Sequence, residues 1–333
     1  MSKKTLFSIL VITLLVTSAI FIFKQRALKK PTNKKPDRVT VLLDWTPNTN
    51  HTGLYVAKDK GYYKAQNLDV DIIQPSEGEA ARIVATGKVD FAVSAAEEVT
   101  FARAKDIPLV SIAAIMQHNT STFASLKSSG IRTARDFEGK RYGGWGSPIG
   151  IATQKILMKK AGGDYNKIEQ ITIGTSDFLA TLGRDADIEW IFYGWEGIQA
   201  KQSGVELSHI WLKDIDPVLD YYTPVIITNE KHVKEQKDLV RRFIQATAQG
   251  YEFSIIHPRD AAKILEKAAP ELNAKLVEES QMWLSPRYKA DAAMWGIQKE
   301  NVWSRYAKWL YDGKLIGRMI DPHKAFTNEF LPK

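Results

Sequence analysis

Residues 39–48 read V-T-V-L-L-D-W-T-P-N, an apolar run that leads into an acid, an indole and a proline. Apolar runs without alternation are typical of strands buried on both faces, as in a parallel sheet covered by helices. Because Pro47 cannot donate a ladder hydrogen bond, we expect the strand to end at about Trp45. Ligands of open α/β sheets bind beyond the carboxyl ends of strands, so Asp44 and Trp45 are candidates for a binding crevice. A core role for Trp45 and a turn role for Asp44 fit this strand end equally well.

Alternating strand and helix patterns continue to Met116. Further strands are expected at 68–73, 89–94 and 108–116. The helices between them are expected at 51–60, 77–86 and 97–105. This order predicts a parallel sheet with helices on both faces.

A second set of elements begins at about Ser121. Its strands are expected at 140–144, 168–173 and 188–193, and its two helices are expected to begin at Ser147 and at Phe178. Residues 225–228 are expected to form a strand that returns to the first sheet. From Lys234 the pattern is almost wholly helical, with breaks expected at Pro258, Pro270, Pro286 and Gly313.

The length of 333 residues exceeds a comfortable single core and favours two lobes. The two sets of elements resemble each other, since each contains an apolar strand that follows an acid and ends in carboxylates. Two α/β lobes with facing strand ends describe a hinged binding protein. The expected domains are a leader and tether (1–38), lobe 1 (39–120 and 225–333) and lobe 2 (121–224).

The N-terminal segment is expected to anchor the protein in a membrane. Residues 5–23 are uncharged and apolar and follow Lys3 and Lys4. At 1.5 Å per residue they span about 28 Å, close to the roughly 30 Å hydrocarbon core. A cleaved signal ending at Ala19 is the alternative, which would release the protein. Residues 24–38 are interpreted as a solvated tether.

The net charge of +8 lies in the first 38 residues, which hold nine Lys or Arg and one acid. The remaining chain is neutral, so we expect no nucleic-acid partner. The chain has no cysteine, which excludes disulfides, thiolate catalysis and cysteine-ligated metals. It also excludes an acylated cysteine, the tether that exported binding proteins commonly carry.

Polar and aromatic side chains gather where the expected strands end. The candidate ligand-binding residues are Asp44, Trp45, Asn48, His51, Ser94, Glu98, Trp145, Ser147, Tyr193, Trp195 and Glu196. Indoles stack on planar rings, and carboxylates accept hydrogen bonds from amino and ring N–H groups. These segments lack Lys and Arg except at their flanks, which favours an aromatic, nitrogen-rich, neutral or weakly cationic ligand. Two alternatives stay open. The helix that starts at Ser147 could bind an anion, and His51 could form hydrogen bonds only with neighbouring residues of the chain and not with a ligand.

Catalytic motifs are absent from the sequence. It contains no P-loop, no dinucleotide fingerprint, no H-E-x-x-H and no G-x-S-x-G. We therefore expect no catalytic residue, no metal site and no cofactor. The aromatic residues between Trp283 and Tyr311 stand mostly at helical spacings and are expected to pack in the core.

Three segments carry a resemblance to a known family. They are L-D-W-T-P-N-T-N-H-T-G-L-Y-V-A-K-D-K-G-Y-Y (43–63), G-K-V-D-F-A-V-S (87–94) and A-R-A-K-D-I-P-L-V-S-I-A (102–113). They resemble the thiamine-precursor pyrimidine proteins, over about residues 38–228. That family includes ThiY-like binding subunits of ABC importers, which capture formylaminopyrimidine, and the fungal synthase of the thiamine pyrimidine. The resemblance implies a type II periplasmic-binding-protein-like α/β fold with the ligand in the inter-lobe cleft, held by Asp44-Trp45 and Trp195-Glu196.

The sequence departs from the synthase branch at its signature positions. The resemblance places that branch's lysine and its sacrificial histidine at Ser94 and Glu98, and its cysteine-rich motif is absent. We therefore expect an extracytoplasmic, membrane-tethered binding subunit, not an enzyme, whose partners are a permease and an ATPase. Its ligand is expected to be a thiamine-precursor aminopyrimidine; riboflavin, a sulfonate or a nitrate-type solute is the alternative, and synthase activity a further one.

Overall fold

The computed structural model describes residues 35–74, 80–174 and 177–333. The chain divides by its contacts into residues 1–36 and 37–333, and the fold below is that of the second unit. The segment expected to be a membrane anchor lies outside the described residues. Of the helices in the described ranges, none has the length and apolar character that crossing a bilayer requires.

The first sheet has the strand order β2-β1-β3-β10-β4. Its strands are β1 (Asp37–Leu42), β2 (Leu68–Ile73), β3 (Phe91–Ser94), β4 (Leu109–Ala114) and β10 (Val225–Asn229). β1 is parallel to β2 and β3, whereas β10 is antiparallel to β3 and β4. The four strands expected up to Met116 are thus parallel to one another, as predicted, and the return of residues 225–228 to this sheet is confirmed. The antiparallel direction of β10 was not predicted.

The second sheet repeats this plan, with the order β7-β6-β8-β5-β9. Its strands are β5 (Ser121–Leu126), β6 (Arg141–Gly144), β7 (Glu169–Thr172), β8 (Ile188–Phe192) and β9 (Leu207–Trp211). β5 runs antiparallel to β8 and β9, and β6 runs parallel to β7 and β8. The sequence did not indicate β5 or β9.

The antiparallel strands have a common cause. The chain crosses between the two sheets at residues 115–120 and again at 220–224, and β5 and β10 directly follow these crossings. A chain that leaves the carboxyl end of a parallel strand enters the facing lobe at the edge where that lobe's parallel strands also end. Ser121, at the start of β5, accordingly pairs with Phe192 at the end of β8. The carboxyl ends of β1, β3, β6 and β8 therefore face the region between the sheets.

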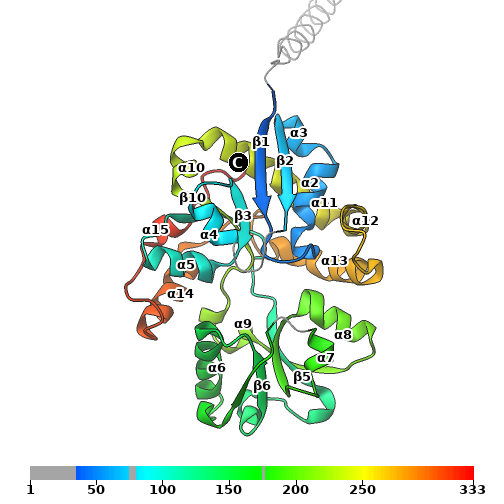
Figure 1. The fold of residues 1–333 in the computed structure, drawn as a ribbon, viewed down its shortest axis with the longest axis vertical. Coiled ribbons are helices and arrows are strands. Elements are labelled where there is room, and N and C mark those ends of the chain that lie inside the picture. The colour runs from blue at the N-terminus through cyan, green and yellow to red at the C-terminus, as the bar shows by residue number, and fades with distance from the viewer. Residues whose placement is uncertain (1–34, 75–79, 175–176) are drawn as a thin grey trace, which may run out of the picture. The chain divides into compact units, whose positions relative to one another are not determined.

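Helices cover both sheets (Figure 1). The helices up to residue 202 are α2 (Thr52–Asp59), α3 (Tyr62–Ala65), α4 (Ala80–Ala85), α5 (Ala96–Ala104), α6 (Pro148–Lys160), α7 (Phe178–Thr181) and α8 (Ile198–Gln202). Those that follow are α9 (Leu212–Ile215), α10 (Glu230–Glu235), α11 (Lys237–Ile256), α12 (Pro258–Ala268), α13 (Ala274–Lys289), α14 (Glu300–Asp312) and α15 (Pro322–Ala325). Short 3-10 turns are η1 (Thr49–His51), η2 (Lys127–Ser129), η3 (Ala134–Phe137), η4 (Tyr165–Lys167) and η6 (Pro217–Leu219), and η5 (Tyr193–Gly197) is a π-helical turn.

The C-terminal helices confirm the helical pattern but not every expected break. Pro286 lies inside α13, so the break expected there was wrong. The buried residues Trp303, Tyr306, Ala307 and Leu310 follow one face of α14, the spacing of a helix that packs on a core. Tyr311 is exposed instead.

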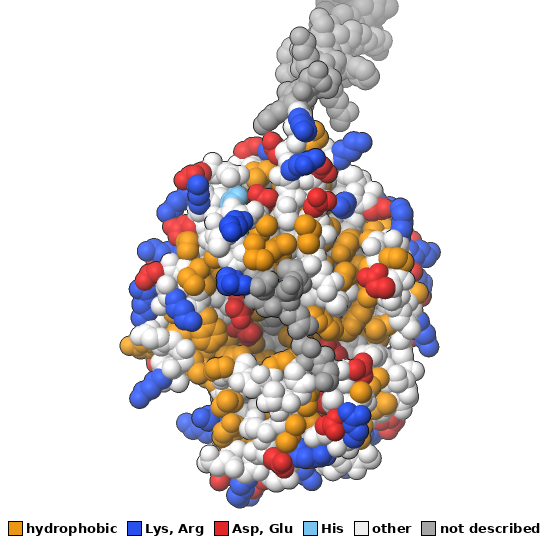
Figure 2. Space-filling model, viewed as in Figure 1, with side chains coloured by type: hydrophobic (Ala, Val, Ile, Leu, Met, Phe, Trp, Pro, Cys, Tyr) orange, Lys and Arg blue, Asp and Glu red, His pale blue; other side chains and the backbone are white. Residues whose placement is uncertain are grey.

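The core and surface of residues 37–333 fit a single compact unit with two lobes. One buried apolar cluster contains residues of both sheets, among them Ala114, Phe123 and Trp190. Basic and acidic side chains are mixed over the face shown in Figure 2, and neither sign gathers in one patch there.

Candidate functional site

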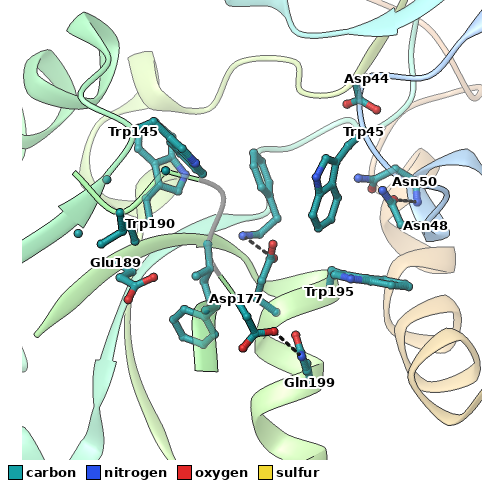
Figure 3. A pocket seen from close by; sticks show the side chains of 18 of the residues that line it. Asp44, Trp45, Asn48, Asn50, Trp145, Asp177, Glu189, Trp190, Trp195 and Gln199 are labelled. Atoms are coloured by element: carbon teal, nitrogen blue, oxygen red, sulfur yellow. Dashed lines mark hydrogen bonds between the residues drawn. The ribbon is translucent and has the colours of Figure 1, made fainter. Parts of the chain in front are cut away.

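A cavity of about 620 Å³ lies where the strand ends of the two sheets face each other (Figure 3). Its side chains come from the end of β1, the β6–α6 turn, α7, β8, η5 and the second crossing segment. The lining residues that carry polar or aromatic side chains are Asp44, Trp45, Asn48, Asn50, Trp145, Asp177, Phe178, Glu189, Trp190, Phe192, Trp195, Glu196, Gln199 and Thr223. Six of the candidates named from the sequence are among them: Asp44, Trp45, Asn48, Trp145, Trp195 and Glu196.

A buried histidine holds the acid at the end of β1. His51 Nδ1 accepts the backbone N–H of Asn48 at 3.2 Å, so this nitrogen carries no proton. Nε2 is then the protonated nitrogen of a neutral imidazole and donates to Asp44 Oδ1 at 2.7 Å. His51 is fully buried, whereas the side chain of Asp44 is 35% exposed. His51 is therefore a positioning residue, and Asp44 presents the carboxylate to the cavity.

The turn η1 positions the amides beside this acid. Asn48 is its N-cap and accepts the backbone N–H of Asn50 through Oδ1 at 2.8 Å. Thr49 Oγ1 lies 2.5 Å from Ser280 Oγ of α13, and Ser280 in turn bonds the carbonyl of Gly194 in η5. The end of β1 and the π turn of the second lobe are thus linked through one helix.

Indole rings provide the flat apolar surfaces of the cavity. Trp45 is 39% exposed and Trp145 is 51% exposed, although large apolar side chains are usually covered. Figure 3 shows Trp45 and Trp195 on one side of the cavity and Trp145 on the other. Trp195 also packs against the small cluster of Ala262, Leu265 and Val277. Exposed rings in a hollow are typical of a site that a ligand covers.

Glu196 reaches the cavity from the π turn. Its Oε2 accepts the backbone N–H of Phe192 at 3.1 Å, and burial raises its pKa to about 7. Single π turns are often found at functional sites. The same turn directs Tyr193 elsewhere, since its ring packs on Trp211 and Trp283 at centroid distances of 5.2 and 4.9 Å.

Five candidates from the sequence do not line the cavity: His51, Ser94, Glu98, Ser147 and Tyr193. Ser94 is buried in β3 opposite Val225. Glu98 lies in the first turn of α5, where partial desolvation raises the pKa of its carboxyl. Ser147 caps α6 by accepting the backbone N–H of Gly150 at 3.1 Å.

Several lining residues were not anticipated, most notably Asp177 and Glu189. Asp177 is the N-cap of α7 and accepts the backbone N–H of Ala180 at 3.0 Å, which a D-F-L-A-T segment could have signalled. Glu189 is a single acid inside the apolar strand β8, and burial raises its pKa to about 7. An isolated acid in such a strand is the signal that could have found it.

The described lining of the cavity contains four acids and no Lys or Arg. The acids are Asp44, Asp177, Glu189 and Glu196. Within the described ranges there is also no group of three or more His, Asp or Glu placed to hold a metal ion. The arrangement can bind planar rings by stacking and can accept several N–H donors or a positive charge.

Comparison with known proteins agrees with this architecture. The family model described as NMT1/THI5 like matches residues 48–261. The formylaminopyrimidine-binding protein of Halalkalibacterium halodurans is 28% identical, over 88% of this chain and 90% of that protein. The 4-amino-5-hydroxymethyl-2-methylpyrimidine phosphate synthase of Legionella pneumophila is 27% identical, over 89% of this chain and 92% of that protein.

Solved structures with the same fold include the periplasmic aliphatic sulphonate-binding protein SsuA of Escherichia coli. The TM-score is 0.68 at 13% sequence identity, with 90% of this chain and 94% of that chain covered. The fold of residues 37–333 is thus the two-lobed α/β fold of periplasmic binding proteins, with the cavity between the lobes.

Proposed function

The chain belongs to the NMT1/THI5-like family, and on this premise we propose that it is the solute-binding subunit of an ABC importer for a thiamine-related aminopyrimidine. The proposal places the two lobes outside the cytoplasm, where such a subunit meets its solute. It assigns the protein no catalytic step and no cofactor. A permease and an ATPase are its expected partners.

The observation that carries the proposal is the combination of exposed indoles with acids that face no Lys or Arg among the described lining residues. Trp45 and Trp145 expose their rings into the cavity, and four carboxylates surround them. An aminopyrimidine offers a flat ring for stacking and an exocyclic amino group for a carboxylate. Anions such as sulfonates and nitrate need cations or free N–H groups, and the described lining residues include no Lys or Arg.

Binding is favoured over synthesis by the residues of β3 and α5. A serine and a glutamate occupy positions 94 and 98, where the resemblance to the synthase implies a lysine and a histidine. Neither residue lines the cavity. The formylaminopyrimidine-binding relative, which is covered over most of its length, points the same way.

Calorimetry on the purified protein tests the ligand class. The panel consists of formylaminopyrimidine, 4-amino-5-hydroxymethyl-2-methylpyrimidine, riboflavin and taurine. We expect saturable binding of a pyrimidine and none of taurine. Binding of taurine without binding of any heterocycle would contradict the proposal. Binding of riboflavin alone would identify the ligand as a flavin and not a pyrimidine.

The proposal includes an uncleaved N-terminal anchor, which rests on the apolar residues 5–23. Intact-mass measurement of protein recovered from membranes of the producing cells tests it. We expect the mass of the full chain. A mature N-terminus near Ile20 on protein recovered from the soluble fraction would identify the segment as a cleaved signal and leave the binding function untouched.

A further inference from the structure

Glu189 is a buried acid whose side chain faces the cavity with one oxygen unpaired. It is 4% exposed and lines the cavity from the middle of β8. Its Oε1 has no hydrogen-bond partner among the described residues. Buried acceptors are almost always paired in folded proteins, so an unpaired one facing a cavity indicates a group that a ligand satisfies.

The neighbours of Glu189 supply no positive charge. Burial raises the pKa of its carboxyl most, a hydrogen bond with the Thr181 side chain lowers it, and Asp185 and Asp177 raise it further as like charges. Arg141, the cation of the neighbouring strand β6, is paired with Asp187, with its Nη2 2.8 Å from Oδ1. The carboxylate at position 189 is therefore free to attract a cation that enters the cavity.

Burial limits the movement of the Glu189 side chain, which is 4% exposed. Residue 143 pairs with Glu189 across β6 and β8, and a Cβ there would lie 3.2 Å from Glu189 Cγ. Gly143 thus leaves room for Ala186 and Ile173, which such a Cβ would approach to 2.7 and 2.9 Å, and also for the side chain of Glu189. A preorganised acceptor binds a ligand without the cost of ordering a mobile side chain.

Glu189 and Asp44 belong to different lobes and lie on opposite sides of the cavity in Figure 3. Asp44, Trp45 and Trp195 offer one carboxylate and two indoles to a single aminopyrimidine ring. The cavity of about 620 Å³ falls within the roughly 300–1,000 Å³ that drug-sized ligands occupy, which is more than one such ring needs. A ligand that reaches both acids would bridge the lobes and favour their closure.

We propose that Glu189 is a specificity-determining residue that binds a positively charged second group of the ligand, so that the solute is an aminopyrimidine joined to a cation. This inference rests on the proposed function, because it assumes that one part of the ligand is an aminopyrimidine. It extends that function from a single-ring precursor to a two-part ligand.

Two probes that share the pyrimidine test the inference by calorimetry. The first is 4-amino-5-hydroxymethyl-2-methylpyrimidine, and the second is thiamine, in which the same ring carries a cationic thiazolium. We expect the Kd of thiamine for the native protein to be at least about tenfold lower than the Kd of the pyrimidine. Equal or weaker binding of thiamine beside clear binding of the pyrimidine would overturn the inference and leave the proposed function standing.

Variants locate the effect in one side chain. Glu189→Gln keeps the shape of the acid and removes its charge, so we expect thiamine to lose most of its advantage while the affinity for the pyrimidine stays unchanged. The matched control is Glu169→Gln, an exposed acid of the same sheet that does not line the cavity, which should retain the native preference. An undiminished preference in Glu189→Gln would overturn the role of this residue. Failure of both probes and of formylaminopyrimidine to bind the native protein would overturn the proposed function itself.

Discussion

Asp44 forms one of several histidine–carboxylate pairs in the described residues, and the pair of His232 and Asp90 lies outside the cavity. His232 Nε2 lies 3.2 Å from Asp90 Oδ1, a contact that resembles the His51–Asp44 bond, but Asp90 does not line the cavity. Asp44→Asn keeps an oxygen for His51 to bond and removes the charge. We expect ligand affinity to fall at least about tenfold, since losing one partner of a desolvated charged hydrogen bond costs on the order of 2–5 kcal/mol.

Asp90→Asn is the matched control for this substitution. Calorimetry should show an unchanged affinity for Asp90→Asn and a reduced one for Asp44→Asn, with the folded fraction of each variant checked by circular dichroism. Equal losses in both variants would assign the effect to the fold and not to a contact between Asp44 and the ligand.

Glu196 gives a second prediction at the level of a single residue. Its pKa is raised by burial to about 7, so ionisation of the carboxyl opposes folding above its ordinary pKa of about 4.3 and does so fully above pH 7. Glu196→Gln can still accept the N–H of Phe192 and carries no charge. We expect the apo protein's Tm to be unchanged or higher at pH 8, while ligand affinity falls at least about tenfold.

Thermal unfolding at pH 5 and pH 8, with calorimetry at pH 8, checks both halves of this prediction. The Tm gain of the variant should shrink toward the lower pH, where the native carboxyl is protonated. A Tm that drops at both pH values would make Glu196 a structural residue of the π turn.

At the scale of elements, the question is whether Ser147 caps the helix α6 or contacts the ligand. Its hydroxyl accepts the N–H of Gly150 at the start of α6 but does not line the cavity. Ser147→Ala should lower the free energy of unfolding by about 1 kcal/mol, the usual cost of losing an N-cap, with ligand affinity unchanged. Urea denaturation measures the first quantity, and Ser147→Asp, which restores a capping oxygen, is the control. A loss of affinity without a loss of stability would instead make Ser147 a binding residue.

The sequence predicted most elements of this fold but not the direction of every strand. The Ser147-Pro148 start of α6 and the end of β2 at Ile73 follow from local chemistry and agree with the structure. β5 was missed because Ser and Thr interrupt its apolar residues, and the antiparallel course of β10 depends on the chain crossing between lobes, which no local pattern encodes. Similarly, the strand ends indicated Asp44 and Trp45, whereas Glu189 lies within β8 and reaches the cavity through the pairing of β8 with β6, which the local sequence does not encode.

At the scale of the whole molecule, the two chain crossings between the lobes meet at His118. Its Nδ1 lies 2.6 Å from Asp220 Oδ2 of the second crossing, and its Nε2 lies 2.9 Å from Asp291 Oδ1, beyond α13. The backbone N–H of Asn119 donates to the other oxygen of Asp220 at 2.9 Å. The imidazolium thus joins three segments at the place about which the lobes of such folds move.

The charge on His118 makes this junction sensitive to alkaline pH. The hydrogen bond with Asp220 raises the pKa of His118 to about 9 in the folded protein, against about 6.5 in the unfolded chain. The stabilisation is therefore fully present below about pH 6.5 and is lost as the pH rises through about 9.

His118→Gln should lower the Tm most at about pH 6, and the difference from the native protein should shrink toward about pH 10. His323→Gln is the control, because His323 is exposed and lies 3.7 Å from Glu300 at the surface. Thermal unfolding of the three proteins across this range decides the matter: a Tm difference for His118→Gln that does not change with pH would mean that His118 supports the crossings by packing and not by its charge.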